Sequence, residues 1–105
     1  MRILVASSDR ETRERLSALL AASGVGVIEA SSLGEAIEVA LIWGAAGAVV
    51  DPALEDAPGR LAAELIHRCL PSLPLVVIEE GMEIQRLLEQ IKQLHGQIKN
   101  SKNEL

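Results

Sequence analysis

A single carboxylate, Asp51, stands where a short apolar segment of the chain ends. Residues 48–50 (AVV) are uncharged and too few for a helix, and Pro52 keeps the residue before it out of the helical region. Asp51 is therefore expected at the carboxyl end of a strand. In open α/β sheets, ligands bind in the crevice beyond those ends, so we expect any site to lie there. The carboxylate of Asp51 could also be a structural group that accepts hydrogen bonds from Ser7, Ser8 or nearby backbone amides.

Other side chains capable of chemistry are isolated in the sequence. Hydrolysis needs a nucleophile beside a positioned base, but His67 and His95 lie within predicted helices, and neither has the short-spaced partners of a metal site. Residues 6–11 (ASSDRE) contain no glycine, which argues against a phosphate-binding loop after the first strand. Cys69 is expected to be a buried small hydrophobe, and Trp43 a half-buried aromatic rather than the anchor of a partner. We therefore predict no catalytic residue and no enzymatic activity.

Composition limits the class of protein. The chain has 105 residues, enough for one domain, and 49% of them are hydrophobic although only one is aromatic. A core of Val, Leu, Ile and Ala suits parallel strands covered by helices. The net charge of −5 argues against binding to nucleic acids or anionic membranes. One cysteine allows no internal disulfide, and no apolar run reaches membrane-spanning length, so we expect a soluble cytoplasmic protein.

Strand and helix signals alternate along the first 80 residues. Strands are predicted at residues 2–6, 25–28, 48–50 and 75–78, and helices at residues 10–22, from Ser31 or Ser32 to Gly44, and from Gly59 to Pro71. Ser7, Ser8 or Asp9 could cap the first helix. This alternation with short turns predicts an α/β domain with a parallel sheet covered on both faces.

The last segment, residues 81–100, has a different pattern. Apolar residues recur there at alternating steps of three and four, at Ile84, Leu87, Ile91, Leu94 and Ile98, with Leu88 widening the stripe. Ile and Leu alternating between the two core positions favour a parallel two-stranded coiled coil, although an amphipathic helix packed on its own sheet gives a similar pattern. Residues 101–105 form a polar tail.

The order of elements and the loop of Asp51 resemble the receiver domain of bacterial response regulators. The resemblance covers residues 2–80. It rests on the frame RILVASSDRETRERLSALL, on GVGVIEASSLGEAIEVA, and on Asp51 followed by Leu54, Asp56 and Gly59 at the family's offsets. It implies a flavodoxin-like (CheY-like) fold in which Asp51 takes the position of the phosphoacceptor.

The sequence departs from that family where phosphoryl transfer needs charge. A phosphorylated carboxylate needs Mg²⁺, held by acidic residues, and a cation on the phosphoryl oxygens. Ser7 and Ser8 match the acid pair, with Asp9 one residue beyond it, and Glu79 matches the hydroxyl residue that ends the fourth strand. The lysine of the fifth strand has no counterpart. Either the fourth helix is lengthened, or the fourth helix and the fifth strand are lost and the fifth helix follows the fourth strand. Both alternatives predict a sheet of four strands.

These observations predict a degenerate receiver domain, or pseudo-receiver, that acts as a noncatalytic interaction module and forms a homodimer through the final helix. Its acid-pocket positions would be vestigial and it would need no cofactor. The alternative is a genuine response regulator, phosphorylated on Asp51 by a histidine kinase, with Mg²⁺ held by Asp9, Asp51 and Ala53. A third reading makes the final helix a linker to an output domain. We divide the chain into a receiver-like core (1–80), a C-terminal helix (81–100) and a tail (101–105).

Overall fold

The computed structural model describes residues 2–58, 61–78, 86, 89–90 and 92–93. None of the helices in these ranges has the length and apolar character needed to cross a membrane. The elements in chain order are β1 (Arg2–Ala6), α1 (Arg10–Ala22), β2 (Gly26–Ala30), α2 (Leu33–Trp43), β3 (Gly47–Val50), β4 (Ala53–Leu54), β5 (Ala57–Pro58), α3 (Leu61–Cys69) and β6 (Leu75–Val77).

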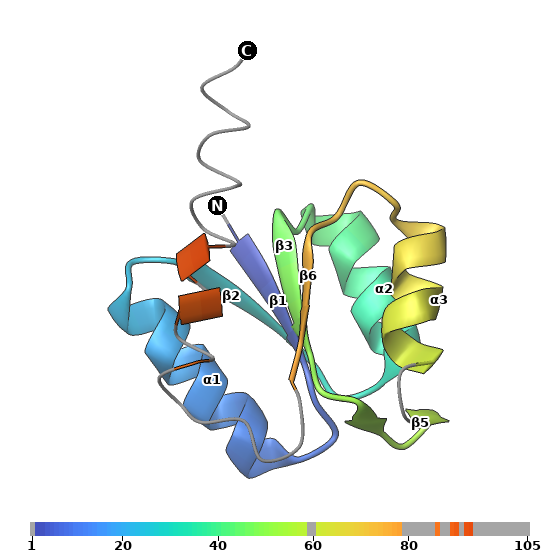
Figure 1. The fold of residues 1–105 in the computed structure, drawn as a ribbon, viewed down its shortest axis with the longest axis horizontal. Helices are drawn as coiled ribbons and strands as arrows, with labels where there is room; N and C mark the ends of the chain where they lie inside the picture. The colour runs from blue at the N-terminus through green and yellow to red at the C-terminus, as the bar shows by residue number, and fades with distance from the viewer. Residues whose placement is uncertain (1, 59–60, 79–85, 87–88, 91, 94–105) are drawn as a thin grey trace.

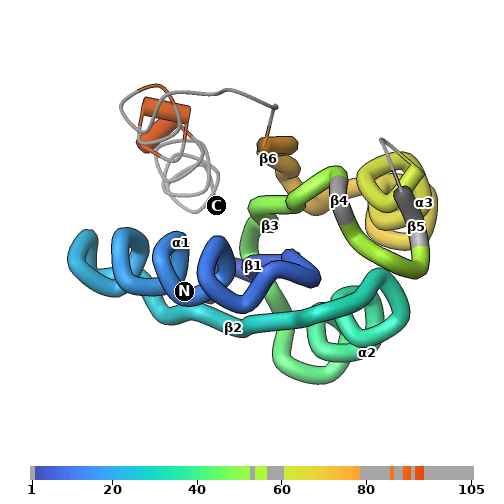
Figure 2. The backbone as a smooth tube through the Cα atoms, turned by 90° about the horizontal axis from the view of Figure 1, so that it is seen from below, coloured from blue at the N-terminus to red at the C-terminus, as the bar shows by residue number. Residues whose placement is uncertain are grey.

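Four of the strands form one parallel sheet in the order β2-β1-β3-β6. Helix α1 covers one face, and α2 and α3 cover the other, as Figures 1 and 2 show. The predicted α/β architecture with a four-stranded parallel sheet is confirmed. The described residues of the C-terminal segment are helical and lie on the α1 side of the sheet (Figure 2). The six residues that define its apolar stripe lie outside the described residues.

Two aliphatic clusters hold the layers together, one on each face of the sheet. Residues alternate between the faces along β1: Ile3 and Val5 join the cluster under α1, whereas Leu4 and Ala6 join the cluster under α2 and α3. All four are 0% exposed, because β1 is central in the sheet and both its faces are covered. The apolar runs of the sequence are the signature of such doubly covered strands.

Local signals set the ends of the helices. Asp9 caps α1 by accepting a hydrogen bond from the backbone N–H of Thr12, and Ser32 caps α2 by accepting one from Glu35. Gly44 ends α2 in the left-handed conformation, with a φ of 71° that residues with a Cβ rarely adopt. The sequence offered three possible caps for α1 and two for α2, and the structure uses the last of each set.

Three features differ from expectation. The β4–β5 hairpin begins two residues after Asp51 and pairs Leu54 with Ala57; two-residue strands are too short to leave a periodic signal. Cys69, expected to be buried, is exposed, because it ends α3 and lines an open groove instead of the core that Ile66 of the same helix fills. Trp43, expected to be half-buried, is 58% exposed, because it ends α2 beyond the sheet, with the guanidinium of Arg2 5.5 Å from its ring centroid.

Candidate functional site

Asp51 lies one residue beyond β3, at the carboxyl end of the sheet. Its backbone N–H donates to the carbonyl of Ala6 at 2.8 Å, which extends the β1–β3 ladder one residue past the end of β3. Ser7, the residue that follows β1, donates its backbone N–H to the carbonyl of Ala30, the last residue of β2, at 3.0 Å. The ends of β1, β2 and β3 therefore meet at one edge, as the sequence predicted for Asp51.

The hydroxyl of Ser7 contacts the Asp51 carboxylate. Its Oγ lies 2.8 Å from Oδ2 of Asp51 and 3.2 Å from the carbonyl oxygen of Asp9, and it accepts the N–H of Asp9 at 3.1 Å. A hydroxyl has one proton to donate, and the shorter contact to the charged acceptor is the stronger hydrogen bond, so Ser7 donates to Asp51. Ser7 is 0% exposed, so this bond is made away from bulk water, whereas Asp51 is partly exposed.

Ser8 does not reach Asp51; it joins three loops. Its hydroxyl donates to the carbonyl of Ser31 at 3.0 Å and accepts the backbone N–H of Glu55 at 3.0 Å. The loop after β1, the loop after β2 and the β4–β5 hairpin are thus tied to one side chain. Of the two serines at the positions of the acid pair, one contacts the carboxylate and the other fixes the loops around it.

The carboxylate of Asp9 is occupied by the first turn of α1. It accepts the backbone N–H of Thr12 at 3.2 Å and the hydroxyl of Thr12 at 2.5 Å. The hydroxyl of Thr12 is the main cause that lowers the pKa of Asp9, since a hydrogen bond to a carboxylate stabilises its charged form. Asp9 is exposed and serves as a helix cap.

Asp56, in the turn of the β4–β5 hairpin, plays the same part for α2. Its Oδ1 accepts the N–H of Leu33 at 2.8 Å and its Oδ2 accepts the N–H of Gly34 at 3.2 Å. The hydrogen bond from Leu33 is the main cause that lowers the pKa of Asp56. The negative charge also lies where the helix dipole favours it. This role leaves no local signal in the sequence, because the partners are 23 and 22 residues away.

The guanidinium of Arg13 in α1 contacts this region. Its Nη1 donates to the carbonyl of Ser7 at 2.8 Å, and its Nε lies 3.4 Å from the carboxylate of Glu29. It borders a cleft of about 460 Å³ whose other charged residues are of both signs. The guanidinium thus holds the end of β1 and is neutralised by an acid of β2, a role that sequence analysis did not assign.

The described residues at the positions named for a Mg²⁺ site do not fit such a site. Mg²⁺ takes near-octahedral oxygen ligands, usually with one or two carboxylates. At the three positions named for such a site, Asp9 is a cap of α1, Asp51 accepts the hydroxyl of Ser7, and Ala53 begins β4. In the described ranges, no group of three His, Cys, Asp or Glu side chains could hold a metal ion.

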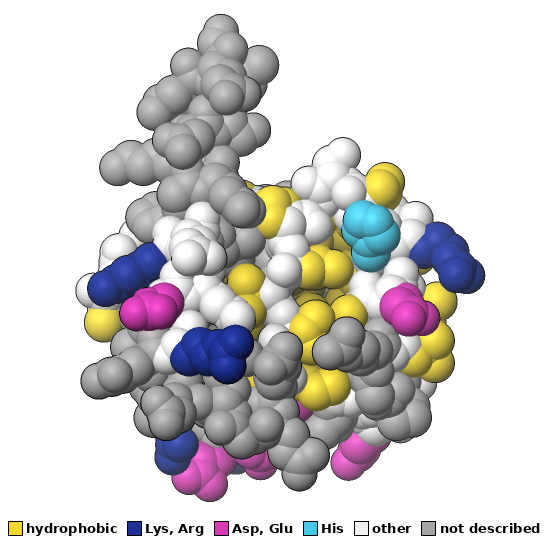
Figure 3. Space-filling model, viewed as in Figure 1, with side chains coloured by type: hydrophobic (Ala, Val, Ile, Leu, Met, Phe, Trp, Pro, Cys, Tyr) yellow, Lys and Arg dark blue, Asp and Glu magenta, His cyan; other side chains and the backbone are white. Residues whose placement is uncertain are grey.

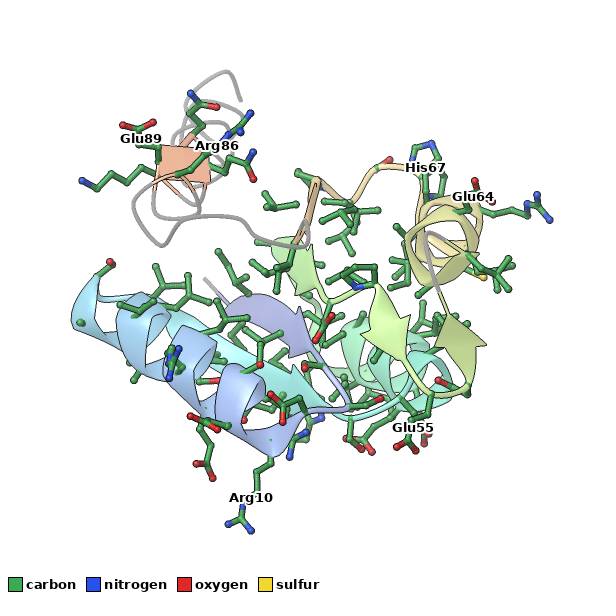
Figure 4. All side chains as sticks on the ribbon, turned by 60° about the horizontal axis from the view of Figure 1, so that its bottom comes forward. Arg10, Glu55, Glu64, His67, Arg86 and Glu89 are labelled. Atoms are coloured by element: carbon green, nitrogen blue, oxygen red, sulfur yellow. The ribbon has the colours of Figure 1, made fainter. Side chains whose placement is uncertain are left out.

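Figure 4 shows how the side chains are distributed. The described histidine, His67, projects from α3 together with Glu64, and Glu55 projects from the hairpin. The other predicted site residues fall elsewhere. Glu79 of the phosphate-binding position, and Ile84, Leu87, Leu88, Ile91, Leu94 and Ile98 of the predicted dimer interface, lie outside the described residues.

Comparison with known proteins identifies the fold. Solved receiver domains superpose closely. The signal receiver domain of an HD domain-containing protein from Pseudomonas fluorescens Pf-5 gives a TM-score of 0.83 at 16% identity, covering 99% of this chain and 93% of that chain. The chain has the fold of a receiver domain.

Two more structures support the same fold. The two-component transcriptional regulator AraC of Clostridium phytofermentans ISDg gives a TM-score of 0.83 at 15% identity, covering 100% of this chain and 99% of that one. The receiver domain of the hybrid histidine kinase CckA gives 0.73 at 22% identity, covering 90% of this chain and 98% of that one. No protein-family model matches the sequence, and no curated protein matches it. At these identities the likeness concerns the fold, and function has to be argued from the site.

Proposed function

We propose that this receiver-like domain is a noncatalytic protein-interaction module in which the phosphoacceptor position, Asp51, has become a structural residue. The observation that carries the proposal is the 2.8 Å hydrogen bond from the buried hydroxyl of Ser7 to the Asp51 carboxylate. It supplies the carboxylate with a protein donor at the position where a working receiver has a metal-binding acid.

The charges around Asp51 support the same proposal. Phosphoryl transfer to a carboxylate brings negative charges together, and enzymes offset them with metal ions and cationic side chains. Here the carboxylates of Asp9 and Asp56 are held by the first turns of α1 and α2, and the guanidinium of Arg13 is paired with Glu29. To recruit these groups, the chain would have to withdraw a carboxylate from the first turn of α1 or α2, or break an ion pair.

The test is phosphorylation with a small-molecule donor. The full chain is incubated with Mg²⁺ and acetyl phosphate and its intact mass is measured; in parallel, beryllofluoride is added and amide NMR shifts around Asp51 are followed. We expect neither an adduct nor shifts, and the variant Asp51→Asn serves as the matched control. An adduct that Asp51→Asn abolishes would refute the proposal.

The second candidate is a response regulator phosphorylated on Asp51 by a histidine kinase. It is favoured by the position of Asp51, which is partly exposed at the carboxyl end of β3 and so can be approached from solvent. It predicts an adduct that is stable in acid, is cleaved by hydroxylamine and disappears in Asp51→Asn. The mass measurement above decides between the two candidates.

The interaction that we propose for the final helix is a homodimer through Ile84, Leu87, Leu88, Ile91, Leu94 and Ile98. Supporting this, the helical residues Arg86, Glu89 and Gln93 are exposed, as expected of the polar face of such a helix. The substitutions Leu87→Glu and Ile91→Glu should each dissociate the dimer at a given concentration, whereas Gln93→Glu adds the same charge on the exposed face and should not. Equal masses in solution for all three variants would refute the role of the helix.

A further inference from the structure

The edge strand β6 leaves part of its backbone directed away from the sheet. The carbonyl of Pro74 accepts the N–H of Ala48, and the N–H of Ile78 donates to the carbonyl of Val50, so both residues face β3. Because backbone groups alternate along a strand, Val76 also faces β3, while the N–H and C=O groups of Leu75 and Val77 face the open edge. In the described part of the chain, no strand lies beyond β6.

The two edges of the sheet differ in a way that matters for association. Natural proteins protect edge strands with charges, and β2 carries Glu29, which is paired with Arg13. Around β6, residues 73–78 (LPLVVI) carry no charge, and each is partly exposed, whereas all residues of the neighbouring strand β3 are buried. An uncharged, apolar edge of this kind is a template for pairing with another strand.

Figure 3 looks onto this side of the molecule, since β6 lies at the front of the view in Figure 1. Hydrophobic side chains are visible near the middle of that face, with charged side chains on either side of them. An apolar patch between charged groups is a common feature of protein interfaces.

We infer that β6 pairs with β6 of a second copy of the chain, antiparallel and with the two-fold axis at Val76. The outward groups fix this register. In an antiparallel pair with Val76 opposite Val76, Leu75 of each copy faces Val77 of the other, and such facing residues exchange both of their hydrogen bonds. Every backbone group that β6 directs outward is then paired, and the two sheets join into one.

A second copy suits this edge because the strand is complementary to itself. An isologous contact places the same patch on both sides, so each residue must tolerate its symmetry mate. Here no like charges meet, and the Val76 side chains, which lie on the α1 face with Ile78, meet each other as a non-hydrogen-bonded pair, where side chains are closest. Leu75, on the opposite face, extends the cluster under α2 and α3.

The contact is small, so the dimer should depend on concentration. Interfaces below about 1,200 Å² are typical of weak and transient complexes. This inference names a surface and a partner for the interaction module proposed above. Only the biological role of the dimer rests on that proposed function; the pairing of β6 depends neither on phosphorylation of Asp51 nor on the final helix.

The first test reverses charges at the axis. Val76→Glu and Val76→Lys are each made in the full chain carrying Leu87→Glu, which removes the proposed helix interface; they place like charges opposite one another and should both sediment as monomers of about the 11.2 kDa chain mass. An equimolar mixture of the two should sediment as a dimer, because Glu then faces Lys. Circular dichroism shows whether each variant is folded. A Leu87→Glu parent that stays monomeric up to the millimolar range, or Val76 variants that dimerise like it, would overturn the inference.

A crosslink supplies the second test and does not depend on charge. In a background with Cys69→Ser, Val76→Cys places two thiols across the axis at a Cα separation of about 4.5 Å, within the range for a disulfide. Val77→Cys is the matched control, since the two copies of residue 77 are out of register by two positions and lie beyond about 7 Å. Rapid disulfide dimers in Val76→Cys alone are expected; equal rates in both would refute the register. If Leu87→Glu dissociates the dimer and the changes at Val76 do not, the final helix forms the interface instead.

Discussion

Removing the hydroxyl of Ser7 tests directly whether the hydrogen bond to Asp51 is structural. In Ser7→Ala the carboxylate loses its 2.8 Å donor, and the N–H of Asp9 loses its acceptor at 3.1 Å. The space left by one oxygen atom at a site that is 0% exposed is small, so the lost hydrogen bonds dominate the change in stability.

The magnitude follows from the charge on the acceptor. A hydrogen bond to a charged group contributes about 1.5–3 kcal/mol to stability, against about 1 kcal/mol for a neutral one. Water can reach the partly exposed Asp51 and restore part of this energy. We therefore expect Ser7→Ala to lower the free energy of unfolding by about 2 kcal/mol, or roughly 8–16 °C in melting temperature for a domain of this size.

The assay is urea unfolding followed by circular dichroism, with Ser17→Ala as the control. Ser17 is partly buried, and its hydroxyl donates to the neutral carbonyl of Arg13 in the same helix at 2.8 Å. Alanine is the better helix former, which offsets the loss of this hydrogen bond. The control should change stability by less than about 0.5 kcal/mol in either direction. If Ser7→Ala were as neutral as Ser17→Ala, the hydrogen bond to Asp51 would not stabilise the fold, and the structural role would be refuted.

Three further outcomes follow from the same contacts. The pKa of Asp9 is lowered in the folded state, so its contribution to stability is present above the unfolded pKa of 3.8 and is lost as the pH falls through the lower folded pKa. In acid unfolding monitored by fluorescence, Asp9→Asn should therefore lose less stability than the wild type below about pH 4. Ser7→Asp places a second carboxylate against Asp51, so it should lower the melting temperature, and Mg²⁺ at ten times its Kd should restore about 1.4 kcal/mol to the variant and nothing to the wild type. Cys69 is exposed, so a thiol reagent should modify it in the native chain as fast as after unfolding in urea.

Each of these outcomes has a result that would count against it. An unchanged acid limb in Asp9→Asn would mean that the cap does not shift the titration of that carboxylate. A variant Ser7→Asp that Mg²⁺ leaves unaffected would show that more than one acid is missing from the pocket. Slow modification of Cys69 in the native chain, accelerated by urea, would mean that the thiol is covered, for example by another molecule bound in the groove that Cys69 lines.

Much of the fold could be read from short stretches of sequence. Apolar runs such as residues 2–6 and 48–50 predicted central strands, because a strand that is covered on both faces exposes neither set of alternating side chains to water. Glycine at position 44 and the polar residues before each helix predicted the helix ends, since caps act over a few residues. The aliphatic composition predicted the type of core, and the position of Asp51 after a strand predicted the edge at which it lies.

The contacts of the site were decided by tertiary structure. The hydroxyl of Ser7 meets Asp51 across 44 residues, and the backbone of Glu55 meets Ser8 across 47, because the parallel register brings the ends of β1 and β3 together. Asp56 became the partner of α2 for the same reason, and Cys69 became exposed because its helix ends beyond the core. The sequence by itself determined which elements form and where the carboxylate stands. Only the folded sheet determined what that carboxylate touches and which strand, β6, lies at an apolar edge of the sheet in the described residues, because both depend on pairing between segments far apart in the chain.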